Sequence, residues 1–111
     1  MISTVLAMLM MAPSPAVIAN ARRDYSMCLD AFMKKSIKDK METAAFESGL
    51  VPACAAKEAA FRAAVVAADM AVGIKRADAE ENAKLEIDDI QLNIKETFRD
   101  TMTPRTASAG T

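Results

Sequence analysis

Residues 25–37 read YSMCLDAFMKKSI, and this stretch decides the fold class. Its apolar and small side chains recur at three- and four-residue spacing, which gathers them on one face of an α-helix. They are Tyr25, Cys28, Leu29, Phe32, Ser36 and Ile37. We therefore expect a first helix over residues 22–38. The charged residues at positions 34, 35 and 38–40 mark its exposed end and a turn.

A second helix is expected over residues 42–72, where apolar side chains again follow helical spacing. Pro52 lies inside this range, and a proline removes the backbone hydrogen bond to the carbonyl group of Ser48, four residues earlier. With Gly49 close by, we expect a kink there or a helix that restarts at Pro52. The expected apolar side consists of Phe46, Leu50, Cys54, Phe61, Ala64, Val65 and Ala68.

A third helix is expected over residues 76–101, with Gly73 ending the one before it at a positive φ angle. An alternative is one long rod through Gly73, because Ala68 and Ala83 would return to nearly the same face of a continuous helix. We favour the break, since Lys75 and Arg76 would interrupt the apolar stripe of such a rod. The apolar face of the third helix consists of Ala83, Ile87, Ile90, Ile94 and Phe98.

Cys28 and Cys54 are the two cysteines of the chain, and each falls on the expected apolar face of its helix. In an antiparallel hairpin with a turn near residues 39–41, they lie at similar heights. We predict a disulfide that stabilises the fold by about 3.5 kcal/mol through loop entropy. The alternative is a pair of unbonded buried thiols. A redox-active pair is not favoured, because such enzymes usually keep their cysteines in a C-x-x-C motif.

The first 21 residues carry no charged side chain. An apolar block over residues 5–12 is followed by Pro13-Ser14-Pro15 and then by Ala19-Asn20-Ala21, the layout of a secretory signal peptide with an A-x-A cleavage site. We expect cleavage after Ala19 or Ala21 and a helical domain over residues 22–102. The alternative is an uncleaved membrane anchor, against which the two prolines count. Residues 103–111 are small and polar, and we expect a disordered tail.

Composition excludes several function classes. The chain has 14 basic and 15 acidic residues and a net charge of −1, so no nucleic-acid surface is indicated. It has no histidine, which removes imidazole catalysis and His-ligated metal sites. The methionines are scattered, and the acidic run at residues 78–89 lacks the pattern of a calcium loop, so we expect no metal and no cofactor. Asp24, Tyr25 and Lys57 lack a second catalytic group at a defined spacing, so we expect no enzyme.

Leu85 and Leu92 suggest an interaction surface. They are seven residues apart and share one side of the third helix, nearly opposite its apolar face. A helical bundle needs only one of these faces inside, so the second is available for dimerisation or for a partner helix. The sequence therefore predicts an all-α protein, a hairpin or three-helix bundle, that is exported to the periplasm or secreted and binds protein. The alternative is a membrane-anchored accessory subunit that keeps its leader.

Overall fold

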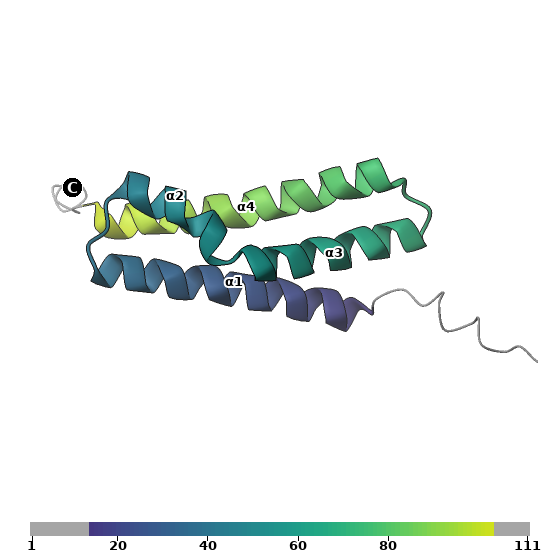
Figure 1. Ribbon diagram of the computed structural model, residues 1–111, viewed down its shortest axis with the longest axis horizontal. Helices are drawn as coiled ribbons and strands as arrows, with labels where there is room; N and C mark the ends of the chain where they lie inside the picture. Colours follow the sequence, from purple (N-terminus) through teal and green to yellow (C-terminus); the bar gives the residue numbers. More distant parts are fainter. Residues whose placement is uncertain (1–13, 104–111) are drawn as a thin grey trace, which may run out of the picture.

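The computed structural model describes residues 14–103, and all four regular elements in this range are α-helices (Figure 1). This confirms the all-α fold class. The helices are α1 (Pro15–Lys38), α2 (Thr43–Ala53), α3 (Ala55–Ala71) and α4 (Arg76–Met102). α1 and α4 run in the same direction, and α2 and α3 together form a broken rod that runs back along both. The expected three-helix bundle is therefore a bundle of three rods, the second of which is two helices.

Helix α1 begins at Pro15, earlier than the predicted start at residue 22. The side-chain oxygen of Ser14 accepts a hydrogen bond from the backbone N–H of Val17 at 3.3 Å, and Pro15 occupies the first turn, where its missing N–H costs nothing. Ser14 and Pro15 thus start a helix. Residues 15–21 of the predicted signal peptide belong to α1, and residues 1–13 lie outside the described range.

The predicted helix over residues 42–72 is divided at Cys54, two residues after Pro52, where a kink or a restart was expected. Pro52 sits in the last turn of α2, and the chain leaves helical geometry at Cys54, with φ −123° and ψ 28°. α3 then starts with a hydrogen bond of 2.9 Å from the N–H of Glu58 to the Cys54 carbonyl oxygen. Cys28 of α1 lies at disulfide-bonding distance from Cys54, with 6.0 Å between the Cα atoms. The break is therefore tied to the middle of α1.

The turn between α3 and α4 has the expected glycine ending. Gly73 has a φ angle of +95°, and the N–H of Ile74 reaches back to the carbonyl oxygen of Asp69 at 3.0 Å. This hydrogen-bond pattern closes a helix at a glycine of positive φ, so α3 and α4 are separate helices and not one rod. α4 covers the third predicted helix almost residue for residue. Of the predicted tail, residues 104–111 lie outside the described range.

Most of the core comes from the predicted apolar faces, to which Met33, Val66 and Ala79 add, and its centre is aromatic. The Phe46 ring stacks on Phe98 at a centroid distance of 4.0 Å and on Phe32 at 5.7 Å, which joins α1, α2 and α4. Gly49 leaves room for the Phe32 ring, because a Cβ atom at position 49 would lie 3.0 Å from that ring. The buried apolar residues are Tyr25, Leu29, Met33, Phe46, Leu50, Cys54, Phe61, Val65, Val66, Ala79, Ala83, Ile87 and Phe98.

Within residues 14–103, none of the helices is both long enough and apolar enough to span a bilayer.

Candidate functional site

A polar cluster lies inside the bundle, where α1, α3 and α4 meet. The side-chain amide of Gln91 donates hydrogen bonds to the Tyr25 hydroxyl oxygen at 2.9 Å and to Glu58 Oε1 at 3.2 Å. The Tyr25 hydroxyl donates to the same Glu58 oxygen at 3.3 Å. The other oxygen of Glu58 accepts from Arg62 at 3.2 Å. Each rod contributes to this cluster, so it joins all three.

Tyr25 and Gln91 form the buried part of the cluster, and Glu58 and Arg62 form its partly exposed edge. Tyr25 has no exposed surface, and its burial, which disfavours a phenolate, raises its pKa to about 12. The nearby Glu58 carboxylate raises this pKa further, while the hydrogen bond from Gln91 lowers it. Tyr25 therefore stays a neutral hydrogen-bond donor at physiological pH. A buried polar group satisfied in this way fixes the register of neighbouring helices.

Sequence reasoning found no partner for Tyr25 and missed Gln91 altogether. The spacing of Gln91 could have indicated its burial. It follows Ile87 by four residues and precedes Ile94 by three, which places it on the apolar face of α4. An amide at such a position has to find a hydrogen-bond partner when it is buried.

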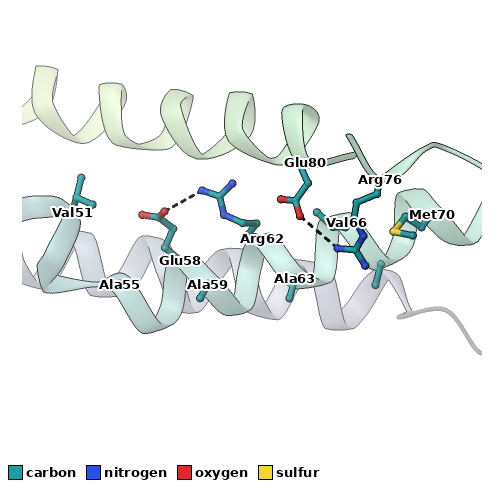
Figure 2. A pocket seen from close by; sticks show the side chains of 11 residues that line it. Val51, Ala55, Glu58, Ala59, Arg62, Ala63, Val66, Met70, Arg76 and Glu80 are labelled. Carbon is teal, nitrogen blue, oxygen red and sulfur yellow. Dashed lines mark hydrogen bonds and ion pairs between the residues drawn. The ribbon is translucent and has the colours of Figure 1, made fainter. Parts of the chain in front are cut away.

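An open groove of about 420 Å³ runs along α3 beside this cluster (Figure 2). It begins near Val51 at the end of α2 and reaches Met70, close to the Gly73 turn. Val66 is buried in the seam between α3 and α4 and forms part of the groove wall. Val51 and Met70 are 42% and 40% exposed and give the groove two large apolar side chains.

Small side chains keep the groove shallow. Ala55, Ala59, Ala63 and Ala67 follow one another at four-residue spacing along α3, and all four are exposed. Residues at this spacing form one row on a helix surface, and a row of methyl groups lets another backbone approach closely. This row was not predicted from the sequence.

Two ion pairs line the groove. Glu58 and Arg62 are paired on α3, and Arg76 and Glu80 are paired on α4 at 3.6 Å. The acidic residue precedes the basic residue on α3 and follows it on α4. Because the two helices run in opposite directions, the acidic group of each pair lies nearer the N-terminal end of α3. Along α3 the charged groups appear in the order Glu58, Arg62, Glu80, Arg76 (Figure 2).

The predicted surface residues Leu85 and Leu92 lie elsewhere. They are 57% and 50% exposed and project from the side of α4 that faces away from its buried residues. Neither lines the groove, so the structure does not bring them together with it. Lys57 is also exposed, on a different side of α3. Among residues 14–103, no three cysteine or carboxylate side chains gather as metal ligands would.

Comparison with known proteins adds no family: no protein-family model, curated protein or solved structure matches this chain.

Proposed function

We propose that the protein is a non-catalytic protein-binding module that receives an α-helix of another polypeptide chain in the groove along α3. The observation that carries the proposal is the groove itself, an exposed apolar surface with a charged border on an otherwise well-packed bundle. Contiguous exposed apolar surface with a polar rim is typical of interaction sites.

A helix is the partner element that fits this surface best. The groove follows α3 from Ala55 to Met70, a length of about 22 Å at 1.5 Å per residue, or about four helical turns. Two helices pack at an interaxial distance near the short end of about 8–10 Å when the residues between them are small. A partner helix needs apolar side chains at three- and four-residue spacing and charges on its flanks to match the groove border.

The charged groups at the groove favour recognition over catalysis. Glu58, Arg62, Arg76 and Glu80 are paired with one another, and Tyr25 is closed to solvent. A reactive site needs a nucleophile or acid–base group that a substrate can reach. Paired surface charges contribute to the choice and orientation of a partner.

The compartment we propose is the periplasm or the outside of the cell. The charge-free segment of residues 1–21 supports export. The cysteine pair at bonding distance supports it independently, because structural disulfides persist in oxidising compartments.

A direct test blocks the groove with one long side chain. Ala63→Arg fills its middle, whereas Ala60→Arg makes the same change at another exposed alanine of α3 that does not line the groove, and it serves as the control. We expect wild type and Ala60→Arg to capture the same protein from envelope or secreted extracts, and Ala63→Arg to lose it. A photocrosslinking residue at Ala59 should join a helix of that protein. Equal capture by Ala63→Arg would refute the groove as the binding site.

The second candidate is a membrane-tethered accessory subunit that keeps its leader. It is favoured by the start of α1 at Pro15, because Ile18 and Ala21 pack against the core and cleavage after Ala19 would remove Ile18 and the Ser14 cap. Intact mass of the protein recovered from the envelope and from the medium separates the two candidates. Loss of residues 1–19 or 1–21 supports export with cleavage, and a full-length chain in the membrane fraction supports the tether.

A further inference from the structure

We propose that the helix received by the groove is α3 of a second copy of this chain, in an antiparallel dimer with two-fold symmetry. This inference rests on the proposed function and names its partner. It is carried by the order of charges along the groove, Glu58, Arg62, Glu80 and Arg76, which alternates between acid and base and has equal numbers of each.

The alternating order is complementary to its own reverse. A second copy turned end for end presents its charges as base, acid, base, acid along the same line. Glu58 then faces Arg76 of the other copy, and Arg62 faces Glu80. Two-fold symmetry repeats both contacts, so all four charges of each copy meet an opposite charge.

The opposite orientation has no such match. If the second copy lay parallel, Glu58 would face Glu58 and Arg62 would face Arg62, and like charges in direct contact disfavour an interface. The charge pattern therefore selects the antiparallel arrangement and fixes its register.

The apolar residues agree with the same register. Reversal of α3 places Ala59 against Ala63, Ala55 against Ala67, and Val51 against Met70, and each of these pairs has its midpoint at or within one residue of position 61. The small residues then meet at the centre, where the helix backbones come closest. The two large exposed side chains cover the ends of the groove.

The dimer should be of modest affinity, because the groove offers a contact only about four helical turns long. Stable complexes bury about 1,200–2,000 Å² of surface. Analytical ultracentrifugation of the oxidised protein, in the form recovered from cells, between about 5 and 500 µM covers the corresponding range of dissociation constants. We expect the mass to rise from monomer to dimer across this range.

Charge reversal tests the register directly. Arg62→Glu places two acidic groups opposite each other at both symmetric contacts, and Glu80→Arg does the same with two basic groups. Each variant alone should dimerise at least about tenfold more weakly than wild type. An equimolar mixture should recover the dimer, because Glu at position 62 of one copy then faces Arg at position 80 of the other.

Two controls keep folding defects apart from lost contacts. Lys57→Glu reverses a charge of the same helix outside the groove and should dimerise like wild type. Because Arg62 also pairs with Glu58, its variant is compared with Ala63→Arg, which leaves every charge in place and should also abolish the dimer. Circular dichroism melting of each variant establishes that it is folded.

The outcomes separate this inference from the proposed function. A wild-type monomer at all concentrations, or a mixture of the two charge variants that stays monomeric, overturns the dimer. If a different protein is then still captured through the groove and lost in Ala63→Arg, the binding function stands with another partner. If Ala63→Arg changes neither dimerisation nor capture, both proposals fail.

Discussion

The ionisation of Tyr25 offers the most direct measurement of the buried cluster. Tyr25 is the single tyrosine of the chain, so the near-ultraviolet absorbance of phenolate reports on this residue alone. Its pKa is raised from 10.0 to about 12, mainly because burial disfavours the charged form. We expect the phenolate of the folded protein to appear with a midpoint near 12, and that of the protein in denaturant to appear near 10.

The same shift predicts a loss of stability at high pH. Between pH 10 and 12 the unfolded chain releases the Tyr25 proton and the folded chain retains it, so the free energy of unfolding falls as pH rises through this window. The contribution is complete below pH 10 and falls by about 1.4 kcal/mol per pH unit, up to about 2.7 kcal/mol in total.

Comparison with Tyr25→Phe isolates this contribution, because every other group of the chain is present in both proteins. Denaturant unfolding of wild type and variant at pH 9 and pH 11 should give a difference that shrinks by about 1.3 kcal/mol at the higher pH. A folded protein whose phenolate appears near pH 10 would refute the reasoning, since the hydroxyl would then be in contact with water.

Three further predictions concern the rest of the bundle. Reduction of the Cys28–Cys54 pair should lower the free energy of unfolding by about 3.5 kcal/mol, as measured by denaturant unfolding with and without a reductant. A difference below about 1 kcal/mol would contradict the loop-entropy argument. Phe46→Ala removes a ring packed between two others and should cost about 3–5 kcal/mol in the same assay. The double variant Leu85→Glu/Leu92→Glu should unfold within about 0.5 kcal/mol of wild type and sediment like it, because both leucines face away from the core and the groove. Loss of the dimer in this variant would place self-association on α4 instead.

Helical spacing predicted the positions of the core. Leu29, Phe46 and Ile87 were assigned to apolar faces from their spacing, and all three are buried. This works because a helix in a bundle buries one continuous stripe, and the stripe is recorded locally in the sequence. The glycine ending at Gly73 was found for the same reason, since it is a property of a few adjacent residues.

The break between α2 and α3 needed more than local sequence. Pro52 indicates a missing backbone hydrogen bond, but the chain leaves helical geometry at Cys54, two residues later. Cys54 is also the residue fixed to α1, 26 positions away in the sequence. A local pattern indicates that a helix is weak, and contact with another helix decides where it ends.

The buried cluster and the groove depend on contacts between helices. Gln91 pairs with Tyr25, 66 residues away, and this pairing follows from the register of α4 against α1. Alanine is small enough to lie in the core or on the surface of a helix, so the exposure of the α3 alanines depends on which neighbours cover them. Both features were therefore missed by reasoning from helical spacing alone.

The alanine row also bears on how this sequence can change over generations. Exposed positions in a helix accept Lys, Glu, Gln or Arg at a cost of a few tenths of a kcal/mol, so folding alone does not require a small residue at Ala59 or Ala63. If only the fold were under selection, both positions would accumulate larger polar residues as fast as Ala60, which is exposed but does not line the groove. In descendants and relatives of this chain, slower substitution at Ala59 and Ala63 than at Ala60 would indicate that the groove has been kept as a binding surface.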